Sequence, residues 1–192
     1  GALYTNTTGT GNTALGPAAY GVTQGPLGLN TSGSSNTAIG MQALLSNTTA
    51  SNNTAVGYQL NTTGTENVAV GTFSLDTNTT GGYNTAIGTY ALGDQTTGSS
   101  NTAVGRQALK FNTTGSQNTA LGREALNRNT TSTNNTAVGF QAAYNTTTSG
   151  SNTALGDSSF YTNTTGYGNS SVGWESLYSN TTAALNTAIG RQ

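Results

Sequence analysis

Residues 101–117 read N-T-A-V-G-R-Q-A-L-K-F-N-T-T-G-S-Q, and the rest of the chain consists of variations on this stretch. The pentad N-T-A-[VIL]-G or a close variant occurs eleven times, and from Asn67 onward its spacing is a constant 17 residues. The pentads begin at Asn12, Asn36, Asn53, Asn67, Asn84, Asn101, Asn118, Asn135, Asn152, Asn169 and Asn186. A second signature, N-T-T-G or a relative of it, begins at Asn6, Asn47, Asn61, Asn78, Asn112, Asn129, Asn163 and Asn180.

This period predicts an all-β fold, a parallel β-solenoid (β-roll) of about eleven 17-residue coils. A repeat of 17 residues is too short for a pair of helices but fits one coil with short strands and turns. Thr, Val and Ile favour strands, whereas Gly and Asn favour turns. We therefore expect one strand on T-A-V-G, a second on Q-A-L, and a turn at N-T-T-G.

Stacked coils place each residue over its counterpart in the next coil, about 4.8 Å away. The leading Asn residues should then form an amide ladder, which in-register stacking favours. The pentad Gly does not vary in eleven copies, which indicates a positive φ or a crowded backbone position. One expected apolar row contains Val70, Ile87, Val104, Leu121, Val138, Leu155, Val172 and Ile189. A second contains Leu75, Leu92, Leu109, Leu126 and Leu177.

Residues 1–192 form a single repeat array, and two coils depart from the period in the same place. One is short between Gly57 and Asn61, and the first full coil carries a Pro- and Gly-containing insertion at residues 17–29. Because length variation is tolerated on the surface, we expect this part of the coil to face outward. The chain starts with Gly1 and both ends fall within a repeat, so we expect an excerpt whose anchor, tip and signal sequences lie elsewhere.

Both faces of the expected strands are apolar. Ala103 and Val104 are adjacent, as are Ala108 and Leu109, and adjacent strand residues point to opposite faces. One face would line the coil interior, and the other would pack against another chain in a lateral oligomer. The alternative is that the alanines only fit a tight bend.

The motif N-T-A-[VIL]-G followed by x-Q-A-L resembles the head repeats of YadA-type trimeric autotransporter adhesins. With the following N-T-T-G it is also similar to repeat arrays of phage tail fibres and related bacterial surface proteins. This resemblance covers essentially the whole chain. It implies a left-handed β-roll packed as a homotrimeric fibre, located extracellularly on a bacterial cell surface or a phage virion. The autotransporter coil is somewhat shorter than 17 residues, which is a departure from that family.

The composition argues against an enzyme and against several kinds of partner. There is no His or Cys and only one Lys, Lys110, so nucleophilic catalysis lacks a partner base and we expect no metal site and no cofactor. Glu124 and Glu175 lie three coils apart, too far for paired-carboxylate chemistry. Five basic and six acidic residues give no basic surface for nucleic acid, and no apolar run would insert into a membrane.

The residue after each pentad Gly varies freely, which indicates that it points outward. This position contains Tyr58, Phe140 and Trp174, which are suited to stack on sugars or contact a receptor protein. Alternatively, they pack on loops or at seams between chains. Residues 17–29, which contain Tyr20, are the other candidate contact.

The leading functional hypothesis is a non-catalytic fibre module of a surface adhesin or phage tail fibre. Such a module extends and presents a binding tip, and attaches weakly and polyvalently to a host surface glycan or protein. The alternative is an ice-binding solenoid that uses Thr ladders. Against it, the paired threonines of N-T-T are adjacent and would point to opposite faces. The expected pentad ladder contains Thr37, Thr54, Thr85, Thr102, Thr119, Thr136, Thr153 and Thr187.

Overall fold

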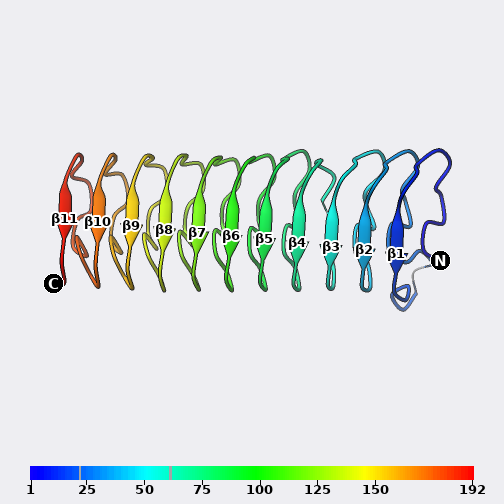
Figure 1. The fold of residues 1–192 in the computed structure, drawn as a ribbon, viewed down its shortest axis with the longest axis horizontal. Coiled ribbons are helices and arrows are strands. Elements are labelled where there is room, and N and C mark those ends of the chain that lie inside the picture. Colours follow the sequence, from blue (N-terminus) through cyan, green and yellow to red (C-terminus); the bar gives the residue numbers. More distant parts are fainter. Residues whose placement is uncertain (22, 61) are drawn as a thin grey trace.

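The computed structural model describes residues 1–21, 23–60 and 62–192, and these form an all-β solenoid without helices. Eleven strands of three residues pair in parallel and in chain order, one in each coil (Figure 1). The strands are β1 (Thr13–Leu15), β2 (Thr37–Ile39), β3 (Thr54–Val56), β4 (Val68–Val70), β5 (Thr85–Ile87), β6 (Thr102–Val104), β7 (Thr119–Leu121), β8 (Thr136–Val138), β9 (Thr153–Leu155), β10 (Ser170–Val172) and β11 (Thr187–Ile189). The coils follow one another along a straight rod, with the two termini at opposite ends (Figure 1).

The strand register confirms that residues one repeat apart lie over one another. Thr102 of β6 pairs with Thr119 of β7, and Ala103 pairs with Ala120. The same register joins β4 to every later strand through β11. The solenoid prediction is therefore confirmed.

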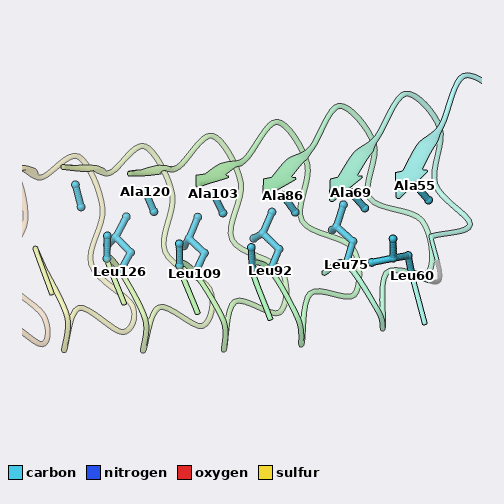
Figure 2. Packing of buried hydrophobic residues seen from close by; sticks show 14 of the residues in the cluster. Ala55, Leu60, Ala69, Leu75, Ala86, Leu92, Ala103, Leu109, Ala120 and Leu126 are labelled. Carbon is cyan, nitrogen blue, oxygen red and sulfur yellow. The ribbon is translucent and has the colours of Figure 1, made fainter. Parts of the chain in front are cut away.

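The interior lies between two facing rows of small and branched apolar side chains (Figure 2). The central Ala of each strand points inward, and Ala103 has no exposed surface. Opposite it, the leucines of Q-A-L form the second row, where Leu109 is also fully buried. The aliphatic residue that ends each strand points outward instead, since the side chains of a strand alternate. The predicted Leu row is therefore internal, and the predicted Val and Ile row is external.

The predicted second strand at Q-A-L is wrong. In its place, successive turns form a ribbon in which Ala108, Lys110 and Asn112 donate backbone hydrogen bonds to the residue three positions back. Gln107 and Leu109 adopt φ values of 60° and 51°. Ala108 and Leu109 are both fully buried, so the argument that they face opposite sides fails with the strand. The ribbon still pairs with its neighbours, because the Leu109 amide donates to the Ala125 carbonyl at 3.0 Å.

Two buried rows of side-chain amides complete the interior. In the first row, the Asn118 side chain donates to Asn101 Oδ1 at 3.2 Å, and its own Oδ1 accepts from Asn135 at 3.1 Å. These contacts confirm the predicted amide ladder. The second row contains the Asn of N-T-T-G, such as Asn112, whose Nδ2 donates to the Gly115 carbonyl at 2.9 Å and closes the turn. Each row therefore binds its own turn and the next coil.

The pentad glycines stack backbone on backbone. Gly105 has a φ of 137°, and a Cβ placed on it would lie 2.4 Å from the Gly122 carbonyl oxygen. The expectation of a positive φ or a crowded position is correct on both counts. Glycine is needed here because only glycine tolerates both conditions.

The two irregular coils rejoin the stack in different ways. Within the segment predicted as an outward insertion, residues 17–29, Leu27 is fully buried in the Leu row and pairs with Ala43, so the outward part ends before it. Tyr20 does lie outside and is fully exposed. Val22 lies outside the described residues, as does Asn61, the predicted start of an N-T-T-G turn. In that short coil Thr62 pairs with Asn78 and occupies the turn-amide row.

Candidate functional site

The outer face of the sheet presents two parallel rows along the rod, which together we call the sheet face. One row contains the first residue of each strand, usually Thr, and the other contains the aliphatic residue two positions later. Most of these side chains are half-buried by their neighbours above and below, while Ile87 and Leu121 reach 39% and 36% exposure. The row is uninterrupted, and at the end strands Leu15 and Ile189 are 66% and 80% exposed. A continuous apolar stripe of this kind marks an interaction surface.

The three aromatic residues predicted after the pentad Gly lie in one column but do not form one site. Phe140 is 39% exposed and Trp174 is 40% exposed, and they are two coils apart. Each is covered in part by an arginine: Arg123 lies 5.2 Å from the Phe140 ring and Arg191 lies 4.3 Å from the Trp174 ring. Their faces are thus partly used within the chain.

Tyr58 and Tyr20 differ from this pair. Tyr58 is half-buried and packs edge-on against Phe73 at 5.5 Å. Phe73 in turn stacks on Tyr90 at 5.0 Å, which makes a short aromatic ladder. Tyr20 stands apart in the outward loop of the first full coil.

A second aromatic ladder, which the sequence analysis missed, contains Tyr144, Tyr161 and Tyr178. The ring centroids are 5.3 and 5.1 Å apart, and the planes deviate by only 10° and 4°. Burial raises the pKa of Tyr161, and its tyrosine neighbours add to this effect. The 17-residue spacing of these tyrosines was visible in the sequence and is the signal that would have found them. Because the rings cover one another, the ladder stabilises the stack and offers mainly ring edges to a ligand.

Charged groups concentrate in the coils of β6 and β7. The Glu124 carboxylate lies 3.0 Å from Arg123 and 3.8 Å from Arg106, and it accepts a hydrogen bond from Gln141 at 2.7 Å. The Gln141 bond, followed by the two arginines, lowers the pKa of Glu124, although burial acts in the opposite direction. Among the described residues these are the only ion pairs, so the nearby Arg128 has no acidic partner there.

An open groove of about 390 Å³ lies beside Arg128 and is lined by Phe111, Arg128, Thr130 and Thr147. It lies where the ribbon enters the N-T-T turn. A second hollow, of about 260 Å³, lies at the open end of the last two coils. Over the stretches that the structure covers, no cluster of acidic side chains is arranged to hold a metal ion, and no helix is present that would cross a membrane.

Comparison with known proteins gives no relative. No protein-family model, no curated protein and no solved structure matches the chain. The function must therefore be argued from the rod and its surfaces.

Proposed function

We propose that the chain is a structural, non-catalytic fibre module of a surface adhesin or a phage tail fibre. It extends and presents a binding tip outside the cell or virion, and it attaches weakly and polyvalently to a host surface glycan or protein. In this proposal three copies of a left-handed solenoid associate side by side. The handedness and the trimer follow from the resemblance to YadA-type head repeats.

The observation that carries this proposal is the uninterrupted aliphatic row of the sheet face. A row that runs the whole length of a straight rod fits a partner of the same length and period, and another copy of the chain meets both conditions. Burying the row in a trimer removes apolar side chains from water, at about 25 cal/mol for each Å². At about 4.8 Å for each coil, eleven strands give a module on the order of 50 Å long.

Light scattering on the full chain tests the assembly. We expect three times the chain mass of 19.3 kDa. The double variant Val104→Lys, Val138→Lys places two charges on the sheet face without touching the interior, and we expect it to be monomeric. The control Gln107→Lys lies on the ribbon and should remain trimeric. A monomeric wild-type chain would refute the proposed assembly, as would a double variant that remains trimeric.

Ice binding is the second candidate, and one observation favours it. The Thr row and the aliphatic row share one sheet face, so hydroxyl and methyl groups form a regular two-row array. The threonines of N-T-T do not contribute to this face. A thermal-hysteresis assay separates the two functions, because a fibre module should show no hysteresis and an ice-binding face should lose it in Thr119→Lys.

A further inference from the structure

We infer that the groove between Phe111, Arg128, Thr130 and Thr147 binds a carboxylated sugar. The inference deepens the proposed attachment function, on which it rests for the source of the sugar. It names the class of ligand and places the contact on the side of the rod. The volume of about 390 Å³ falls within the range of small-ligand sites.

The groove combines an exposed aromatic ring with an unneutralised cation. Phe111 is 40% exposed, although its column elsewhere contains polar residues such as Asn145 and Thr162. The Arg128 side chain donates one hydrogen bond, to Asn145 Oδ1 at 3.2 Å, which leaves most of its five N–H groups free. A guanidinium with free N–H groups suits a carboxylate, which it binds through two parallel hydrogen bonds. The ring suits the apolar face of a sugar.

Neighbouring groups add to this preference. Lys110 Nζ lies 4.2 Å from the Phe111 ring centroid and brings a second positive charge to the groove. The Thr130 hydroxyl donates to the Thr147 carbonyl at 3.2 Å, and the Thr147 hydroxyl donates to the Thr164 carbonyl at 3.3 Å. Both hydroxyl oxygens are therefore left as acceptors for the O–H groups of a sugar. The set as a whole provides cations, hydroxyl acceptors and a ring.

The groove stays accessible in the proposed trimer. The Leu row of the ribbon faces the Ala row of the strands across the interior, so the ribbon lies opposite the sheet (Figure 2). Phe111 continues the ribbon, and a second chain packed on the sheet face would leave the groove open. Three copies for each fibre and many fibres for each particle turn a weak single site into useful avidity.

The test compares methyl β-glucuronide with methyl β-glucoside, which differ only in the carboxylate, by NMR titration of the full chain. We expect the glucuronide to bind with a dissociation constant on the order of 1 mM and about tenfold more tightly than the glucoside. Arg128→Gln should abolish that preference, and Phe111→Thr should weaken both sugars. Arg106→Gln, whose charge is already paired with Glu124, is the matched control and should bind like the wild type. An unchanged thermal midpoint verifies the fold of each variant.

Three results would overturn the inference. One is a glucuronide preference that survives Arg128→Gln, and another is no binding of either sugar at 10-fold above about 1 mM. The third is equal binding of inorganic phosphate, since a simple anion site needs no ring. The mass measurement above is independent of these titrations, so failure of the groove and failure of the fibre assembly are distinguishable.

Discussion

At the residue scale, the pentad glycine is the most constrained position in the coil. Gly105→Ala would combine a φ of 137° with a Cβ 2.4 Å from a neighbouring carbonyl oxygen. We expect a loss of about 3 kcal/mol or more in the free energy of unfolding, measured by denaturant titration. Gly93→Ala is the control, because its Cβ would lie 3.4 Å from the nearest atom and should cost little. Equal tolerance of both substitutions would contradict the close stacking of coils.

The two amide rows differ in how much substitution they should tolerate. Asn118 joins Asn101, Asn135 and the Ser132 carbonyl, so Asn118→Thr would leave several buried groups without partners. We expect a cost of about 2–3 kcal/mol in thermal or chemical unfolding. Asn112→Thr is the matched comparison and should cost less, because Thr62 and Thr146 already occupy that row. The reverse order of the two costs would show that the rows have been assigned the wrong roles.

Glu124 gives the fold a pH dependence of known sign. Its folded-state pKa is lowered from 4.5, so its contribution to stability is full above that value and disappears as the pH falls through the lower folded pKa. We expect Glu124→Gln to be less stable than the wild type near neutral pH and to lose less stability on acidification. Melting curves from about pH 3 to about pH 7 check this expectation.

The control for that experiment is Glu175→Gln. Glu175 occupies the same column and forms no ion pair in the part of the chain described, so its substitution should leave the acid limb of the curve unchanged. Parallel curves for the wild type and Glu124→Gln would contradict the role of the Arg106–Arg123–Glu124 cluster.

At the scale of the element, the Leu row contains one compensated pair. Ala143 and Phe160 occupy successive places in a row that is otherwise mostly Leu, and both are buried. The large ring follows the small side chain, so Ala143→Leu alone should overpack the interior by about 1–3 kcal/mol. Phe160→Leu should relieve this, and the double variant should show a favourable coupling of about 1 kcal/mol or more in a denaturant-based cycle. Strictly additive costs would mean that the two side chains do not share one space.

The sequence predicted the strands well and the ribbon poorly, for a physical reason. The T-A-[VIL] run is β-favouring and its register follows from the period, whereas Q-A-L has no recognisable turn residue. Leu109 adopts a positive φ because its amide bonds to the next coil and its side chain fills the interior. Those gains come from stacking, which local propensity does not describe. The predicted turn at N-T-T-G needed no such help, because Asn and Gly favour turns by themselves.

The candidate contacts were predicted in part. Free variation after the pentad Gly correctly placed Phe140 and Trp174 outside. It did not reveal the arginines that cover them or the tyrosine ladder, because those contacts join columns in which only a few coils depart from the consensus. The groove at Phe111 and Arg128 likewise depends on one pair of neighbouring coils.

At the scale of the whole molecule, stability and proposed function have the same source. Each coil binds only its neighbours, through strand pairing, two amide rows and an Ala–Leu interior, so the rod extends by repetition. The same repetition aligns the aliphatic row that is proposed to join three chains. Variation is left to the ribbon side, where the charges, the aromatic ladders and the groove lie.

The central claim is that residues one repeat apart lie directly over one another along a rod. The chain has no Cys, so spin labels can be placed at Ser100 and Ser151, three coils apart, and at Ser100 and Leu185, five coils apart. Labelled chains diluted into unlabelled chains should give distances of about 14 Å and about 24 Å, that is about 4.8 Å for each coil. Distances that do not grow in this proportion, or broad distributions typical of an unordered chain, would contradict the account.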